Sequence, residues 1–261
     1  FGWEPTPTGG VIMFLADAPP VGYVVYTLDL GDEPVAKYHL LRQGTERSIS
    51  NVNGDTLTIK DGVLNWQRAD GTITDLLRFI DEGDAGDAYH YAAPQEDMVV
   101  KAEMVRKVRS VSSPVYERLI INHRMRVAPE LNDDLTRGRG VRLIEVQTEV
   151  TFYDHIPGVY FRTTFDNTAH GHRLRAHLRT GIDANNVLTQ SIFNFNVQPA
   201  GRVHASQGIC AVHDGVSSLA LVTRGLPEVE STREDGQITL GVTLVRAIGV
   251  LCRESLDQRT Y

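Results

Sequence analysis

Cysteine is scarce in this sequence, with only Cys210 and Cys252 among 261 residues. Two cysteines in so long a chain do not make the disulfide framework that is typical of small secreted domains. Both lie in apolar surroundings, Gly-Ile-Cys-Ala-Val and Val-Leu-Cys-Arg, so we interpret them as small buried hydrophobic residues. This use of cysteine favours a cytoplasmic location.

The sequence also lacks long apolar runs and a basic patch. No run approaches the ~20 apolar residues that cross a bilayer, and no signal-peptide pattern is present. The formal net charge is −7 and the basic residues are scattered, whereas a nucleic-acid-binding domain usually carries a basic face. We therefore expect neither a membrane nor a nucleic acid as a partner. The chain starts at Phe1 without a methionine, and we expect it to be a fragment of a longer protein.

The motifs of several enzyme classes are missing. The sequence has no Gly-x-Ser-x-Gly nucleophile elbow, no P-loop and no dinucleotide-binding fingerprint. It has no His-x-Asp and no His-Glu-x-x-His pattern, which would supply metal ligands. We therefore expect no catalytic residue, no metal site and no cofactor within this chain.

Helical periodicity is nearly absent, and period-2 alternation of apolar and polar residues takes its place. Asp61-Gly62 and Asp70-Gly71 are hairpin turn signals between short alternating segments. Later alternating segments are long, which is typical of large sandwiches. The sequence predicts an all-β fold, a large antiparallel β-supersandwich, with under about a tenth of residues in helix against the usual third. Strands are expected at 98–108, 115–127, 141–152, 159–165, 209–213, 218–222 and 237–243, and a short helical insertion at 129–135.

Proline marks one weak boundary. Five of the 11 prolines fall within residues 1–40, around two short strand-like runs. We interpret 1–40 as a lead-in β segment that could belong to an upstream module, and 41–261 as the supersandwich domain.

The segment 79–91 is unlike a scaffold, with four carboxylates in seven residues, two glycines, two tyrosines and a histidine. Carboxylates accept hydrogen bonds from sugar hydroxyls, and tyrosine rings stack on pyranose faces. A calcium loop is an alternative, although its aspartates do not match the EF-hand pattern. A general acid and base pair and a solvated acidic turn also stay open. The candidate substrate-binding residues are Asp84, Asp87, Tyr89 and Tyr91.

The histidines at 170, 172 and 177 suggest a metal cluster, but strand geometry argues against it. In a strand over 172–178, His172 and His177 point to opposite faces. We expect no metal there, and favour Arg175 or Arg179 as part of a polar cleft.

Four segments, in order, resemble glycoside hydrolase family 38, the α-mannosidase family, in the β region C-terminal to its catalytic barrel. The loop 81–91 is the most specific of them, with His90 where bacterial members often have asparagine. The others are Pro-Val-Gly-Tyr at 20–23, His-Arg-Leu-Arg at 172–175 closing with Thr-Gly-Ile at 180–182, and the late segment 219–228 running on to Leu-Val-Arg at 244–246.

The resemblance implies a galactose-mutarotase-like supersandwich in an enzyme that cleaves α-mannosides with retention. It implies a zinc ion and an aspartate nucleophile in an N-terminal catalytic domain of the same parent chain, outside this fragment. It also implies a β-domain loop that reaches the sugar, for which we expect Asp84, Asp87 and Tyr89 to supply the contacts. The fragment alone is expected to be inactive.

Two other functions stay open. One is an autonomous carbohydrate-binding sandwich, and the other is a mutarotase- or lyase-like enzyme on the same fold. Trp66 lies in an alternating strand and is expected in the core rather than on a binding platform. An α-mannoside or related oligosaccharide is the expected ligand, and a homo-oligomer is left open.

Overall fold

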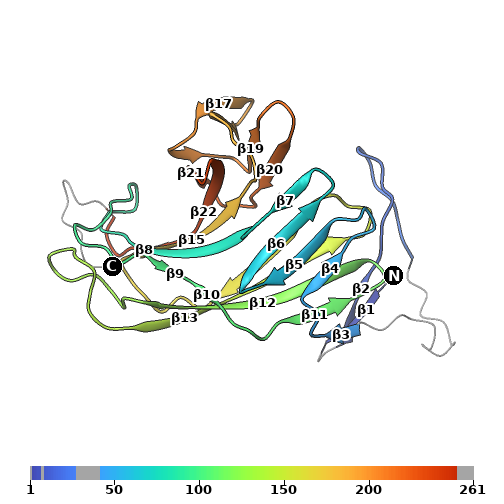
Figure 1. Ribbon diagram of the computed structural model, residues 1–261, viewed down its shortest axis with the longest axis horizontal. Coiled ribbons are helices and arrows are strands. Elements are labelled where there is room, and N and C mark those ends of the chain that lie inside the picture. The colour runs from blue at the N-terminus through green and yellow to red at the C-terminus, as the bar shows by residue number, and fades with distance from the viewer. Residues whose placement is uncertain (1, 7–8, 28–41, 252–261) are drawn as a thin grey trace.

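The computed structural model describes residues 2–6, 9–27 and 42–251, and every regular element in these ranges is a β-strand. All strand pairs are antiparallel (Figure 1). The all-β prediction is therefore confirmed. Nowhere in these ranges is there a helix of the length and apolarity needed to span a membrane.

A four-stranded meander, the β5 sheet, follows the turn signals in the sequence. Asp61 and Gly62 both have positive φ, 52° and 80°, as the two central residues of a type I′ hairpin turn require. Alternation then places Ile59 and Leu64 inward as a directly opposite pair, next to the Lys60–Val63 pair that flanks the turn. The strands are β4 (Ser48–Ser50), β5 (Thr56–Lys60), β6 (Val63–Arg68) and β7 (Gly71–Ile73).

The longest strands form a six-stranded β12 sheet. Twelve consecutive pairs join β12 to β13 without a register shift, so the inward-facing set of each strand stays on one face. The strands are β14 (Tyr160–Phe165), β13 (Arg142–Tyr153), β12 (Tyr116–Val127), β11 (Arg109–Ser112) and β3 (Arg42–Gly44), with β10 (Glu103–Met104) also paired to β12.

A second six-stranded sheet, the β15 sheet, carries the candidate site. Its central strand is buried at all eight positions, because both of its faces are covered. The order is β18 (Val203–Ala205), β21 (Glu228–Glu234), β22 (Gln237–Ala247), β15 (His172–Arg179), β8 (Leu77–Gly83) and β9 (Val100–Lys101).

The predicted single strand over 98–108 is wrong. This segment is split into β9 and β10, which pair with different six-stranded sheets. Between them the Ala102 amide donates to the Phe79 carbonyl of the β15 sheet, and the Val105 amide donates to the Asn122 carbonyl of the β12 sheet. The segment thus crosses from one sheet to the other, which its continuous alternation does not reveal.

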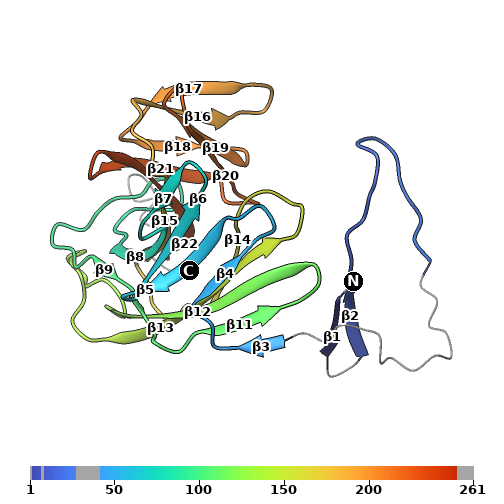
Figure 2. The same cartoon turned by 45° about the vertical axis from the view of Figure 1, so that its right-hand side comes forward.

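A second four-stranded sheet, the β16 sheet, lies at one end of the molecule (Figure 2). The sheet consists of two hairpins, β16–β17 and β19–β20, which lie side by side because β16 pairs with β19. The strands are β17 (Phe195–Pro199), β16 (Asn186–Gln190), β19 (Ile209–His213) and β20 (Ser218–Val222).

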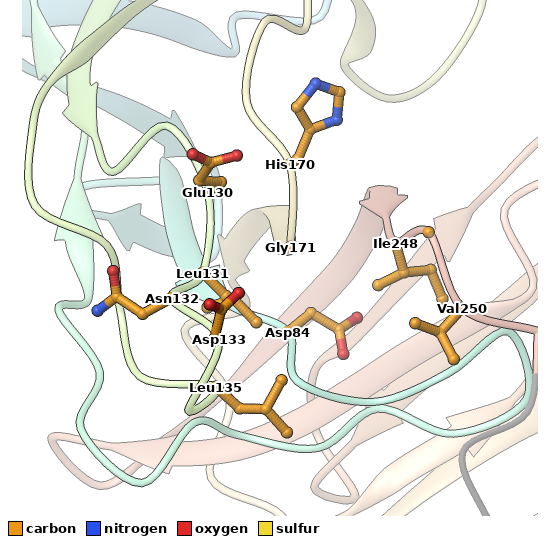
Figure 3. Close-up of a pocket in the computed structure, with 11 residues that line it drawn as sticks. Asp84, Glu130, Leu131, Asn132, Asp133, Leu135, His170, Gly171, Ile248 and Val250 are labelled. Atoms are coloured by element: carbon orange, nitrogen blue, oxygen red, sulfur yellow. The ribbon is translucent and has the colours of Figure 1, made fainter. Parts of the chain in front are cut away.

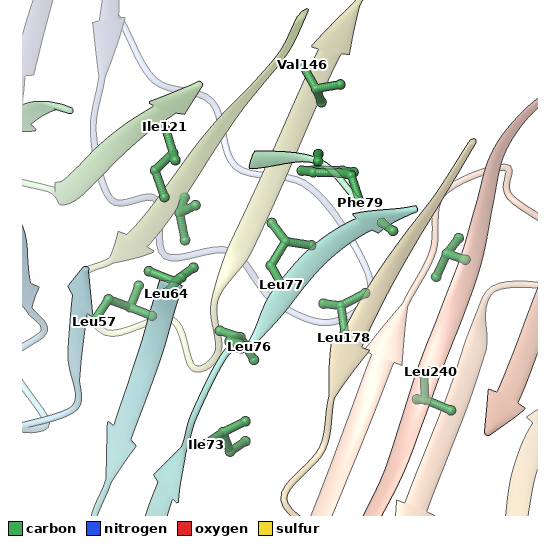
Figure 4. Packing of buried hydrophobic residues seen from close by; sticks show 14 of the residues in the cluster. Leu57, Leu64, Ile73, Leu76, Leu77, Phe79, Ile121, Val146, Leu178 and Leu240 are labelled. Atoms are coloured by element: carbon green, nitrogen blue, oxygen red, sulfur yellow. The ribbon is translucent and has the colours of Figure 1, made fainter. Parts of the chain in front are cut away.

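One hydrophobic cluster joins these sheets (Figure 4). Phe79 of β8 packs in it with Ile121 of β12 and Val146 of β13, and Leu64 of β6 belongs to the same cluster. Trp66 is partly buried against this cluster, which agrees with its expected place in the core. Cys210 of β19 is also a member, and burial raises the pKa of its thiol to about 11. Cys252 lies outside the described residues.

The predicted helical insertion at 129–135 is wrong. The segment is an irregular turn closed by a bridge between Leu131 and Arg137. Leu135 there has a φ of 63°, which a right-handed helix excludes. A proline at a plausible first helical position was the misleading signal.

The lead-in segment begins with a hairpin of β1 (Gly2–Thr6) and β2 (Gly9–Met13). Beyond it, Phe14 and Tyr26 meet edge to face at 4.9 Å, and the Tyr26 hydroxyl donates to the Asp17 carbonyl over 2.9 Å. Residues 28–41 lie outside the described part, so the boundary at residue 40 stays a prediction. The supersandwich arrangement also stays a prediction, because the described strands form five separate sheets rather than two large layers.

Candidate functional site

The acidic loop leaves the end of β8 and is more enclosed than its composition suggests. Asp81, Asp84 and Asp87 are all buried, whereas a solvated acidic turn would expose them. The buried part ends at Asp87, and Ala88 to His90 are exposed. The loop is therefore a packed base with an exposed tip.

Arg246 near the end of β22 holds the base of the loop. Its Nε donates to Asp84 Oδ2 over 2.7 Å, and its Nη2 donates to the carbonyls of Asp87 and His90, each over 2.9 Å. Asp84 Oδ1 accepts from the Gly86 amide over 3.0 Å. One guanidinium thus links both sides of the loop to the β15 sheet.

Asp87 shapes the tip. Its Oδ1 accepts from the amides of Tyr89 and His90 over 2.9 and 2.8 Å, and its own amide donates to the His90 carbonyl. Gly86 is required by space rather than by a positive φ, since a Cβ there would lie 1.9 Å from the His90 carbonyl oxygen. Asp84 and Asp87 thus stabilise the conformation of the loop, and their role as sugar contacts stays a prediction.

The two tyrosines differ in their surroundings. Tyr89 is 68% exposed at the tip. Tyr91 is half-buried, and its ring stacks on the Arg173 guanidinium with 3.4 Å from Cζ to the ring centroid. Burial raises the pKa of Tyr91, although the positive charge of Arg173 opposes the shift. Tyr89 is therefore the candidate most accessible to a ligand.

A buried ion network lies beneath the loop. Asp81 contacts the Arg137 guanidinium through Oδ1 and His172 Nδ1 through Oδ2. His172 Nε2 lies 2.9 Å from Asn167 Oδ1. Sequence analysis proposed no role for Asp81, Arg137 and His172 together, because they belong to three segments that only the fold brings together. The network fixes the 130–137 turn against β8 and β15.

A cavity of about 220 Å³ lies beside the base of the loop (Figure 3). Its wall combines apolar side chains with the carboxylates of the 130–137 turn. Leu131 approaches so closely that a Cβ on Gly171 would lie 2.7 Å from its Cγ. Residues that line the cavity include Asp84, Glu130, Leu131, Asp133, Leu135 and Ile248.

The outward side of β15 carries a polar row, Arg173, Arg175, His177 and Arg179. All four side chains are buried, and the polar cleft that the sequence suggested for Arg175 or Arg179 stays a prediction. Glu82 Oε2 accepts from Arg173 Nε and its Oε1 accepts from Arg175 Nη2, each over 2.8 Å. Arg175 also contacts Glu230 of β21. Most of the charge in this row is therefore matched within the sheet.

His177 is the exception in the polar row. Neither ring nitrogen has a hydrogen-bond partner among the described residues. Burial, together with Arg175, Arg173 and Arg78, lowers the pKa of His177 to about 3. Burial also lowers the pKa of His123 on β12 to about 4, with Asp75 opposing the shift.

These two histidines should make the chain less stable in mild acid. Below pH 6.5 both rings take up protons in the unfolded chain but stay neutral in the folded chain. Proton uptake therefore favours the unfolded chain, and the free energy of unfolding decreases as the pH falls below that value. Each histidine should remove about 2 kcal/mol of unfolding free energy between pH 7 and 5. Denaturant titrations over this range measure the effect. The loss should be smaller in His177→Gln and unchanged in the exposed control His213→Gln. An unaltered pH dependence in His177→Gln would contradict the assignment.

No group of three or more His, Cys, Asp or Glu side chains that could hold a metal ion occurs in the parts of the chain that the structure describes. His172 and His177 lie on opposite faces of β15, and His172 faces Asp81 rather than another histidine. The residues described do not fit a zinc site.

Comparison with known proteins gives results only at the level of structure. No family model matches the sequence, and no curated protein matches it. Two solved structures from Enterococcus faecalis do match, a protein in glycosyl hydrolase family 38 (TM-score 0.71) and an alpha-mannosidase from strain V583 (TM-score 0.72). Each is 25% identical over 82% of this chain. The match spans only 28% and 27% of those chains, so this chain is similar to a part of such enzymes.

Proposed function

We propose that this chain is the C-terminal β domain of an α-mannosidase-type glycoside hydrolase. The observation that carries the proposal is the match over 82% of the chain to two family 38 structures at 25% identity. The two six-stranded sheets, joined by one hydrophobic cluster, would be the layers of the supersandwich. Residues 1–40 would belong to the preceding module. The catalytic domain, its nucleophile and its zinc would lie elsewhere in the parent chain.

In this proposal the loop 84–91 completes the sugar site. Its exposed tip presents Tyr89 and His90, while Asp84, Asp87 and Arg246 hold the backbone in shape. The backbone of the tip is held in place this way, and the Tyr89 ring stands exposed above it, where it could stack on a pyranose. The contacts to sugar would thus come from the tip, and the carboxylates would act indirectly by holding the backbone of the tip in shape.

The function is tested on the intact parent protein. It should hydrolyse aryl α-mannosides, and product analysis by NMR should show retention of the anomeric configuration. Activity should be lost on chelation and return with zinc. A parent protein that is folded, loaded with zinc and inactive on every α-mannoside tested would refute the proposal.

The loop is tested separately by Tyr89→Ala in the parent. A stacking and hydrogen-bonding contact that is stronger in the transition state should cost on the order of 10- to 100-fold in kcat/KM. The unfolding free energy should change by less than about 0.5 kcal/mol, because Tyr89 is exposed. Arg246→Met should lower both kcat/KM and stability, since it leaves the buried Asp84 without its positively charged partner. Tyr160→Ala, an exposed tyrosine on β14, is the control. Wild-type kinetics in Tyr89→Ala would show that the tip does not touch the sugar.

A further inference from the structure

The cavity beside the acidic loop is continuous with the loop tip. The Ala88 amide of the tip donates to the carbonyl of Val250, which lines the cavity, over 2.9 Å. Asp84, which is bound to Arg246 at the base of the loop, also lines the cavity. A ligand that contacts the tip at Tyr89 therefore lies beside the cavity.

The cavity has room for one small unit of a ligand. Its volume of about 220 Å³ equals that of about seven water molecules in the liquid. Pockets that enclose a whole drug-sized ligand usually measure about 300–1,000 Å³. The cavity therefore suits a single pyranose unit that belongs to a larger molecule.

Apolar side chains line the cavity on either side of Asp84. Leu131 and Leu135 of the 130–137 turn lie on one side of it, and Ile248 and Val250 lie on the other (Figure 3). A pyranose presents C–H groups on the faces of its ring and hydroxyls around its edge. Apolar walls around a polar group match that distribution.

Asp84 is the buried polar group of the cavity, at 1% exposed. Its Oδ1 accepts from the Gly86 amide and its Oδ2 accepts from Arg246 Nε. An ionised carboxylate can accept about four hydrogen bonds, so acceptor positions remain for a hydroxyl inside the cavity. Asn132, which also lines the cavity, donates its side-chain amide to Thr136 Oγ1 within the turn.

The charges around the cavity favour a neutral ligand. Glu130 and Asp133 line it, are exposed, and form no ion pair within the described ranges. Arg246 pairs with Asp84 over 2.7 Å. His170 is exposed, with its ring directed away from the other lining side chains (Figure 3). The lining therefore offers acceptors to hydroxyl donors and repels an anion.

We propose that this cavity binds one uncharged sugar unit and discriminates against a unit that carries a phosphate or carboxylate. The identity of the unit rests on the proposed function: if the tip contacts the mannose that is released, the cavity takes the leaving-group unit beside it. The preference for a neutral unit should be on the order of 10-fold at low salt, because two exposed carboxylates repel a nearby anion. It should decrease as added salt screens them.

NMR titration of the 261-residue chain tests the cavity without any need for catalysis. Methyl α-mannoside should shift the amide signals of Gly171, Ile248 and Gly249, which line the cavity. The dissociation constant should be millimolar, as expected for one hydrophilic unit. Methyl α-mannoside 6-phosphate should bind about 10-fold more weakly at low salt.

Glu130→Gln/Asp133→Asn should remove most of that preference, because it removes both unpaired carboxylates. Asp61→Asn/Glu103→Gln is the matched control, since it removes two exposed carboxylates that do not line the cavity. Asparagine suits the positive φ of 52° at position 61. The control should keep the preference of the wild type.

In the intact parent protein, Glu130→Gln/Asp133→Asn should likewise raise kcat/KM for a disaccharide with a phosphorylated leaving unit, relative to the neutral disaccharide. Equal affinities of the wild-type chain for the two methyl mannosides would overturn the inference. So would unchanged cavity amides at sugar concentrations well above the millimolar range, or a preference that is lost equally in the control. If the cavity amides respond as expected but the parent hydrolyses no α-mannoside, the cavity is a sugar site and the proposed mannosidase function is wrong.

Discussion

Purified alone, the chain should show no turnover of an aryl α-mannoside, with or without added zinc. Retaining hydrolysis needs two carboxyl groups about 5 Å apart on either side of the scissile bond. The carboxylates of the acidic segment are already engaged by partners within the fold. Asp81 contacts Arg137 and His172, Glu82 holds Arg173 and Arg175, Asp84 pairs with Arg246, and Asp87 accepts from two loop amides.

The intact parent protein, assayed in parallel, is the positive control. Mixing the chain with a separately produced catalytic domain should recover part of the activity if the two associate. Robust turnover by the chain alone would place the catalytic machinery inside it and would favour the mutarotase- or lyase-like alternative. That outcome would also require two catalytic carboxylates other than those engaged by partners within the fold.

Asp81→Ala should destabilise the chain by about 3–5 kcal/mol, the usual cost of removing one partner from a buried ion pair. Asp81 and His172 are fully buried and Arg137 is nearly so. Without the carboxylate, the buried Arg137 guanidinium would keep only Asp97, whose Oδ1 lies 3.7 Å from its Nε, as an acidic neighbour. The same change should also release the 130–137 turn, because Arg137 ties that turn to β8. Denaturant unfolding measures the free energy, and hydrogen exchange follows the turn.

Asp70→Ala is the matched control, since Asp70 pairs with Arg68 at the surface. Exposed ion pairs contribute about 0–1 kcal/mol, so its unfolding free energy should stay close to that of the wild type. Asp81→Asn keeps the size of the side chain and serves as the milder variant if Asp81→Ala does not fold. Equal small effects for Asp70→Ala and Asp81→Ala would mean that water reaches the network.

Local patterns were sufficient for most strands and for the tight turns. Alternation predicted 209–213 and 218–222 with the bounds that the structure has, and Asp61-Gly62 predicted the hairpin between β5 and β6. These features depend on interactions between near neighbours in the sequence. The split of 98–108 between two sheets was missed, because alternation is the same whichever sheet a residue pairs with.

Composition identified the acidic segment as unusual but could not assign its side chains. Sequence analysis expected Asp84 and Asp87 to contact the sugar, whereas the structure buries both side chains. The deciding partner, Arg246, lies 162 residues from Asp84. No local signal marks such a contact, since it forms only when β22 and β8 pair on either side of β15.

The sequence by itself determined the all-β class, the turn chemistry and the family resemblance, because each depends on residue types and their spacing. Only the tertiary structure decided which carboxylates are buried against arginine and which tyrosine reaches solvent. Those properties depend on what packs against each side chain. Burial changes the energy of a charge or an apolar surface by several kcal/mol, so the properties of the acidic loop follow from its packing as much as from its sequence.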